Sequence, residues 1–169
     1  MKHILILLAA LSLAACSSNP TKAPYAGENE GLVIFAADIE VIGDTELEYD
    51  FIFTVENMDT GEQFRQRMPV DEDQNYAVMG RLVPGEYRFV KREDIRRDGQ
   101  GIRLFDIEGE FSVEAGHVTL PKRVTVEKKL FTRKVEITEL DSSAAEVLFL
   151  SDILTDDTYE GWSLLRPAE

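Results

Sequence analysis

The sequence predicts an all-β protein, a single antiparallel β-sandwich followed by a short C-terminal helix. The first observation is an alternation of apolar and polar residues, clearest at 47–56, which is typical of a half-buried antiparallel strand. The second is the close spacing of such segments, with turn residues between them. The third is composition. Hydrophobic residues make up 44% of the 169-residue chain, enough to build the core of one domain.

The chain begins with the three parts of a secretory signal, in the required order. A short positive start is followed by an apolar run at 4–13, which is shorter than the about 20 residues that span a bilayer. The run closes on Leu13-Ala14-Ala15-Cys16, which resembles the lipobox of bacterial lipoproteins, and Cys16 is the only cysteine. The resemblance implies that the Cys16 thiol receives a diacylglyceryl group and that the chain is cut before it. An ordinary signal peptide with a chance cysteine is the alternative.

This resemblance divides the first 30 residues into a signal peptide at 1–15 and a lipidated, flexible tether at 16–30. The tether is rich in Pro, Ser, Gly and charge without apolar periodicity. Ser17 follows the cysteine, where an aspartate would retain a lipoprotein in the inner membrane. By this analogy we expect a lipid-anchored protein of the outer membrane that faces the periplasm. Acylation of both the thiol and the new amino terminus would make the anchor stable.

The predicted sandwich occupies residues 31–140. Its expected strands are 32–42, 47–56, 62–68, 76–79, 86–91, 105–113, 117–120, 124–127 and 131–140. In the second of these strands, one row is expected on the core and the alternate row toward water. The core row is Leu47, Tyr49, Phe51, Phe53 and Val55, and the water-facing row is Glu48, Asp50, Ile52, Thr54 and Glu56.

The tail at 141–169 changes character and is expected to pack on the sandwich. Ser142 or Ser143 is the expected helix cap, with acid in the first turn. A broad apolar face would follow, made of Val147, Leu148, Leu150, Ile153 and Leu154. A strand at 147–150 is the competing prediction.

Residues 73–89 carry a second resemblance. Asp73, the turn at Asn75, Tyr76, Leu82, Pro84-Gly85 and Tyr87 are similar to a stretch of transthyretin-like (prealbumin-like) and Cna-B-like sandwiches. Asn75 stands where that family usually has glycine, although Asn also tolerates the left-handed conformation. Tyr76 and Val78 are expected to bury from one strand, and Tyr87 and Phe89 from the next. The resemblance concerns fold and implies no particular activity.

The charge is strongly negative and unevenly distributed. The chain holds 32 Asp and Glu against 18 Lys and Arg, a formal charge of −14, which argues against nucleic acid as a partner. Two stretches, 81–103 and 122–134, are nevertheless basic. A basic face on an acidic body would steer an acidic partner. The alternative is that these residues pair with acids on neighbouring strands. The expected partner-binding residues are Arg88, Lys91, Arg92, Arg96, Arg97, Lys128 and Lys129.

The remaining chemistry-bearing residues do not form a recognisable catalytic or metal motif. Asp71, Asp73 and Asn75 open like a calcium loop, but Tyr76 and Leu82 stand where an EF-hand needs Gly and Glu. His117 follows Gly116 in an expected hairpin, and no Gly-x-Ser-x-Gly occurs. We therefore expect no enzyme, no metal site and no cofactor.

The sequence thus predicts a non-enzymatic, lipid-anchored envelope protein whose sandwich binds or scaffolds another envelope protein. A lipoprotein that binds a small ligand, a glycan or cell-wall material is the alternative. A concave site lined by aromatic residues would favour the alternative.

Overall fold

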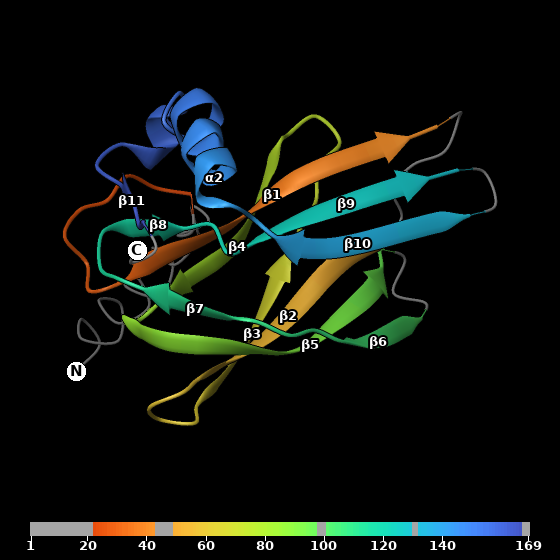
Figure 1. Cartoon of the computed structure of the whole chain (residues 1–169), viewed down its shortest axis with the longest axis horizontal. Coiled ribbons are helices and arrows are strands. Elements are labelled where there is room, and N and C mark those ends of the chain that lie inside the picture. Colours follow the sequence, from red (N-terminus) through yellow and green to blue (C-terminus); the bar gives the residue numbers. More distant parts are fainter. Residues whose placement is uncertain (1–21, 43–48, 98–100, 130–131, 167–169) are drawn as a thin grey trace, which may run out of the picture.

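The computed structural model describes residues 22–42, 49–97, 101–129 and 132–166. The expected signal peptide, Cys16 and the first part of the expected tether, 16–21, lie outside these residues. The described chain is mostly β and forms two sheets with one short α-helix above them (Figure 1).

Sheet A contains six strands in the order β10–β9–β1–β8–β11, with β4 on the opposite edge of β1. Its strands are β1 (Gly31–Val41), β4 (Tyr76–Leu82), β8 (His117–Thr119), β9 (Lys122–Lys128), β10 (Arg133–Glu139) and β11 (Ser163–Leu164). The prediction of a purely antiparallel sandwich is wrong for this sheet, because β1 pairs in parallel with β8 and β9. Strand β11, which pairs in parallel with β8, was not predicted.

Sheet B contains five strands in the order β3–β2–β5–β6, and β7 also pairs with β5. Its strands are β2 (Tyr49–Asn57), β3 (Gln63–Met68), β5 (Gly85–Arg96), β6 (Ile102–Asp106) and β7 (Glu110–Val113). All its pairs are antiparallel. The expected strand at 105–113 is in fact two strands. Gly109, at φ 120°, interrupts it and accepts a hydrogen bond from the Phe89 N–H at 2.9 Å.

The main hydrophobic core lies between the two sheets. Phe35 of sheet A and Phe53 of sheet B are in contact, with ring centroids 4.8 Å apart. Phe51, Phe53 and Val55 are fully buried there, which confirms the predicted core row for these residues. Leu47 and Glu48 lie outside the described residues.

The predicted water-facing row of β2 is largely wrong. Asp50, Ile52 and Thr54 are also buried, although they point to the other face of sheet B. Long side chains from β3 and from the end of β5 cover this face, and Arg67 and Arg97 both contact Asp50. The alternation in the sequence is real, but it separates an apolar interior from a charge-covered face rather than from water.

A second apolar cluster lies on the far side of sheet A, under the C-terminal tail. The predicted helix is confirmed as α2 (Ser142–Leu148), which continues into the π-helical turn η1 (Phe149–Ile153), so the competing strand at 147–150 is wrong. A 3₁₀ turn, η2 (Asp157–Tyr159), follows. The helix cap is Asp141, whose carboxylate accepts a hydrogen bond from the Ala144 N–H at 2.9 Å, and the first turn holds no acid. The predicted serine caps are therefore displaced by one or two residues.

The second cluster includes two residues that were expected in a core shared with Tyr87 and Phe89. Tyr76 and Val78 of β4 are buried as predicted, but they pack beneath Phe149 and Tyr159 of the tail. Tyr87 and Phe89 of β5 lie between the sheets. Strands β4 and β5 therefore contribute to different layers.

Residues 22–30, expected to belong to the tether, lie against the body of the protein. The Tyr25 ring contacts Trp162, with centroids 5.0 Å apart, and the Tyr25 N–H donates to Glu160 O at 2.9 Å. Trp162 Nε1 donates to Ala23 O at 3.0 Å, and Arg81 Nη2 donates to the same oxygen at 3.1 Å.

Candidate functional site

A hollow near the predicted residues lies between β3 and β4. Both are edge strands in the described part of the chain, since each pairs with only one other strand. Their facing edges and the turn that joins them enclose a pocket of about 730 Å³, which we call the seam. The residues that line the seam are Lys22, Gln66, Arg67, Pro69, Val70, Asp71, Glu72, Asp73, Gln74, Ala77, Val78, Met79 and Arg97.

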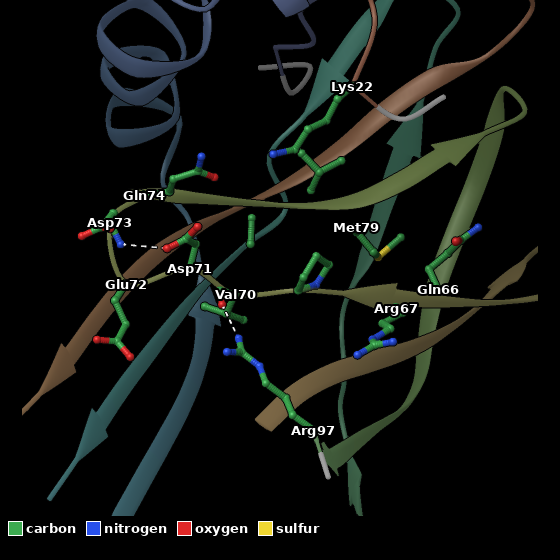
Figure 2. A pocket seen from close by; sticks show the side chains of 13 residues that line it. Lys22, Gln66, Arg67, Val70, Asp71, Glu72, Asp73, Gln74, Met79 and Arg97 are labelled. Atoms are coloured by element: carbon green, nitrogen blue, oxygen red, sulfur yellow. Dashed lines mark hydrogen bonds between the residues drawn. The ribbon is translucent and has the colours of Figure 1, made fainter. Parts of the chain in front are cut away.

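The seam has two chemically different sides. Figure 2 shows Asp71, Glu72 and Asp73 together on one side, with Arg67 and Arg97 on the other. Its floor is apolar and includes Val70, Ala77 and Met79. The pocket could therefore hold a segment that carries both an acidic and a basic group.

Two arginines are held in place by one buried aspartate. Asp50 accepts hydrogen bonds from Arg67 Nε at 2.9 Å and from Arg97 Nε at 3.0 Å, and Arg67 Nη2 also bonds to it. Arg97 Nη2 donates to Val70 O at 2.8 Å (Figure 2). Two cations around one carboxylate leave a net positive charge, and both arginines remain substantially exposed, at 65% and 46% of the side chain.

The acidic side of the seam is a solvated turn. Asp71 accepts a hydrogen bond from the Asp73 N–H at 3.2 Å, and the Gln74 N–H donates to Asp71 O at 3.4 Å. Within the described residues, no three His, Cys, Asp or Glu side chains are grouped so that they could hold a metal ion.

Next to the seam, on the same face of sheet B, Glu93 is held by two basic side chains. Arg65 binds both carboxylate oxygens, at 3.1 and 2.7 Å, and Lys91 Nζ lies 3.2 Å from one of them. These hydrogen bonds, the Arg65 pair above all, lower the pKa of the Glu93 carboxyl to about 2 although its side chain is buried.

A second aspartate lies between two arginines, on the opposite face of sheet B. Asp94 is fully buried between the sheets, with its carboxylate 2.8 Å from Arg92 Nε and 2.6 Å from Arg133 Nη2. The guanidinium of Arg133 lies 3.7 Å from the Tyr49 ring centroid, and that of Arg92 lies 4.2 Å from the Phe105 centroid. Burial lowers the pKa of Arg92, against the opposing effect of Asp94.

The structure separates the seven predicted partner-binding residues. Arg92 lies in the interior and is not available at the surface. Four others are exposed or half-exposed and ion-paired: Arg88 with Glu56, Lys91 with Glu93, Arg97 with Asp50, and Lys129 with Glu127. Arg96 and Lys128 are half-buried at the ends of β5 and β9. Most of these cations are thus matched by acids nearby, as the alternative of paired strands predicts.

The two basic stretches do meet, but through a buried contact. Arg133 of β10 reaches Asp94 of β5 across the gap between the sheets. In Figure 1 the ends of β9 and β5 and the start of β10 lie at the same end of the molecule. Arg97, by contrast, lies at the seam.

The seam was not predicted from the sequence, because its lining comes from three separate parts of the chain: Lys22, residues 66–79 and Arg97. Its acidic turn was recognised, and so was Arg97, but Arg67 and Gln66 were assigned only to a strand. Pro69, which ends β3, was the available signal, since it marks the point where the chain crosses from one sheet to the other.

His117 lies at the start of β8, after the turn at Gly116. Its ring is half-buried and its Nδ1 lies 3.0 Å from the Ala115 carbonyl oxygen and 3.9 Å from the Glu114 carboxylate.

No helix among the described segments is long and apolar enough to cross a membrane.

Comparisons with known proteins identify no family for this chain. No protein-family model and no curated protein matches it. Among solved structures, a leucine-rich repeat protein from Bacteroides thetaiotaomicron is similar at a TM-score of 0.39 and 16% identity, over 75% of this chain. The chain spans 17% of the length of that protein. A likeness at this level carries no argument about fold or activity.

Proposed function

We propose that this protein is a non-enzymatic lipoprotein of the outer membrane that binds another envelope protein at the seam. The observation that carries the proposal is the seam itself, an open pocket between two edge strands with acids on one side and arginines on the other. Edge strands offer unpaired backbone groups, and binding of an extended segment along such an edge is a recurring mode of protein recognition.

The anchor rests on the first sixteen residues. The positive start, the short apolar run and Leu13-Ala14-Ala15-Cys16 support lipidation of Cys16 after cleavage, and Ser17 supports sorting to the outer membrane. The acyl chains would hold the domain at the membrane, because the acidic body is repelled by anionic lipid.

The finer fold that we propose is a transthyretin-like sandwich. Two sheets with a shared core support it, as does the course of the chain at the Pro84-Gly85 turn. There the Tyr87 hydroxyl donates to Val83 O at 2.8 Å, so that the buried tyrosine fastens the turn. The parallel pairing of β1 with β9 is a departure from the purely antiparallel sheets that we expected of this class.

The charged lining of the seam supports a protein partner. A polypeptide can carry both basic and acidic side chains, which can pair with the acidic turn and with the arginines of the seam at the same time. The residues that line the seam include no aromatic side chain on which a sugar ring could stack, and this disfavours a glycan as the ligand. Arg67 and Arg97 at the seam are already paired with Asp50. This pairing favours a partner that contacts the exposed parts of paired side chains, and it disfavours a purely acidic partner that would need a surface of unpaired basic residues.

A small-ligand or glycan binder is the second candidate, and one observation favours it. The volume of the seam, about 730 Å³, lies within the range of small-molecule sites, roughly 300–1,000 Å³. Purified cell-wall sacculi distinguish the candidates. Sedimentation of the protein with sacculi, lost in Arg67→Ala, would support the second candidate and contradict the first.

The anchor is tested by Cys16→Ser. We expect this variant to leave the membrane fraction while its circular dichroism stays that of a folded β protein. Retention of the variant in the membrane pellet after a high-salt wash would show that something other than a lipid on Cys16 holds the protein there.

A further inference from the structure

The C-terminal helical segment, α2 and η1, buries one apolar side and leaves three large apolar residues exposed on another. Ala145, Phe149 and Ile153 are buried against sheet A. The face predicted as one broad apolar surface is split. Leu148 and Ile153 pack inward, whereas Val147, Leu150 and Leu154 are exposed by 63%, 57% and 42%. We call these three exposed residues the stripe.

The stripe runs along the whole helical segment. Val147 belongs to α2, Leu150 to the π-helical turn η1, and Leu154 is the residue that caps this turn. Large apolar side chains that lie together on an exposed surface often mark an interaction site.

The surroundings of the stripe are hollowed on both sides. Leu150 and Leu154 line a hollow of about 460 Å³ together with Leu165, next to the edge strand β11. Val147 lines another hollow of about 520 Å³, between the helix and β1. A ridge of aliphatic side chains between two hollows matches the way amphipathic helices pack against each other.

The charge around the stripe is mostly negative. The charged residues that line the two hollows are Asp38, Asp141, Glu146 and Asp152 against Arg123 and Arg166, and Arg166 is paired with Glu146 at 2.7 Å. An acidic rim around an apolar ridge disfavours anionic lipid, and it disfavours a second copy of a chain that carries a formal charge of −14.

We propose that the stripe docks a basic amphipathic helix of a partner protein. The apolar face of that helix would cover Val147, Leu150 and Leu154, and its Lys or Arg residues would face the acidic rim. The inference does not rest on the seam, which lies at the edges of β3 and β4, and it stands or falls independently of the function proposed there.

The probe is a fluorescein-labelled, 18-residue amphipathic helix of Lys and Leu, with a Glu and Leu peptide of the same pattern as its counterpart. The full chain is held in phosphatidylcholine nanodiscs, with empty nanodiscs as the blank, and binding is followed by anisotropy. The test variant is Leu150→Gln with Leu154→Gln. The control is Leu104→Gln in β6, where the leucine is also exposed, at 66%.

We expect the Lys peptide alone to bind, more weakly as salt is raised, and at least tenfold more weakly to the test variant than to the control. The stripe residues are exposed, so circular dichroism should show that both variants fold. Equal binding to the test variant and the control would overturn the proposal, as would binding of the Glu peptide. A dimer in sedimentation that the test variant loses, or a stripe-dependent gain in binding to anionic nanodiscs, would assign the stripe to a second copy or to lipid instead.

Discussion

Asp50 and Asp94 each lie between two arginines, on opposite faces of sheet B, and the two clusters differ in how water reaches them. The arginines that hold Asp50 are 65% and 46% exposed, whereas those that hold Asp94 are 10% and 11% exposed. The Asp50 cluster can exchange protein contacts for water, and the Asp94 cluster cannot. The comparison teaches that similar ion pairs differ in importance when only one of them is cut off from solvent.

The largest effect is expected from a charge placed next to these clusters, in the main core. Phe51, between Asp50 and Ile52, is fully buried against Phe35 and Phe53. Phe51→Asp should prevent folding or cost several kcal/mol, because an unpaired charge would be buried. Circular dichroism and urea denaturation measure the loss. A folded Phe51→Asp protein of near-normal stability would show that the strand has been placed the wrong way round.

The next effect separates the two aspartates directly. Asp94→Asn leaves two buried guanidinium groups without a counter-charge, and we expect it to lower the free energy of unfolding by about 3–5 kcal/mol. Asp50→Asn should cost only about 1–2 kcal/mol, because Arg67 and Arg97 can turn to solvent. Urea denaturation of both variants tests the difference. Equal losses would mean that exposure of the arginines does not decide the contribution of the pair.

A smaller effect concerns acid, through Glu93. Its pKa is about 2 in the folded protein, against about 4.5 for an unperturbed glutamate. As the pH falls, Glu93 therefore takes up a proton in the unfolded chain before it does so in the folded protein. The stabilisation that the Glu93 ion pairs give the folded protein is complete above about pH 4.5 and is lost as the pH falls toward 2. Glu93→Gln should remove about 1 kcal/mol at pH 7, because Arg65 and Lys91 are half-exposed, and it should flatten the fall in melting temperature below pH 4.5. Glu62→Gln, in the turn between β2 and β3, is the control and should leave that fall unchanged. An unaltered acid profile in Glu93→Gln would show that this ion pair contributes nothing.

The smallest effect on stability is expected at the exposed end of β9. Lys128→Glu with Lys129→Glu removes surface pairing worth about 0–1 kcal/mol, so the melting temperature should hardly change. Arg96→Glu with Arg97→Glu is expected to be less benign, because Arg97 also bonds to Asp50 and to the Val70 carbonyl. Differential scanning calorimetry compares the pairs. A larger loss in the lysine pair would contradict this order.

Much of the fold could be predicted because the evidence for it is local. The alternation around Phe51 and Phe53 predicts both a strand and its buried row, and the change of pattern after Asp141 predicts the helix. The parallel pairing of β1 with β9 could not be predicted, because residues such as Ile39 and Val126 are far apart in the chain. Strand pattern indicates which face is apolar, but not which strand lies alongside.

The candidate site was less accessible to sequence reasoning for the same reason. Asp50 looks like a water-facing residue until Arg97, which is 47 positions away, is seen to cover it. Arg92 looks like a surface cation until it is found beside Asp94 on the inner face. A basic stretch in a sequence therefore does not predict a basic surface when the acids that neutralise it are on neighbouring strands.

The most direct test of the proposed function is a photo-crosslink from the seam in living cells. The crosslinking amino acid p-benzoylphenylalanine would replace Gln74, which lines the seam, or Val83, an exposed residue of the β4–β5 turn, as a matched control. We predict a discrete adduct with one envelope protein from position 74 that is absent from position 83. The same adducts from both positions, or none from position 74 in a membrane-bound and folded protein, would contradict partner binding at the seam.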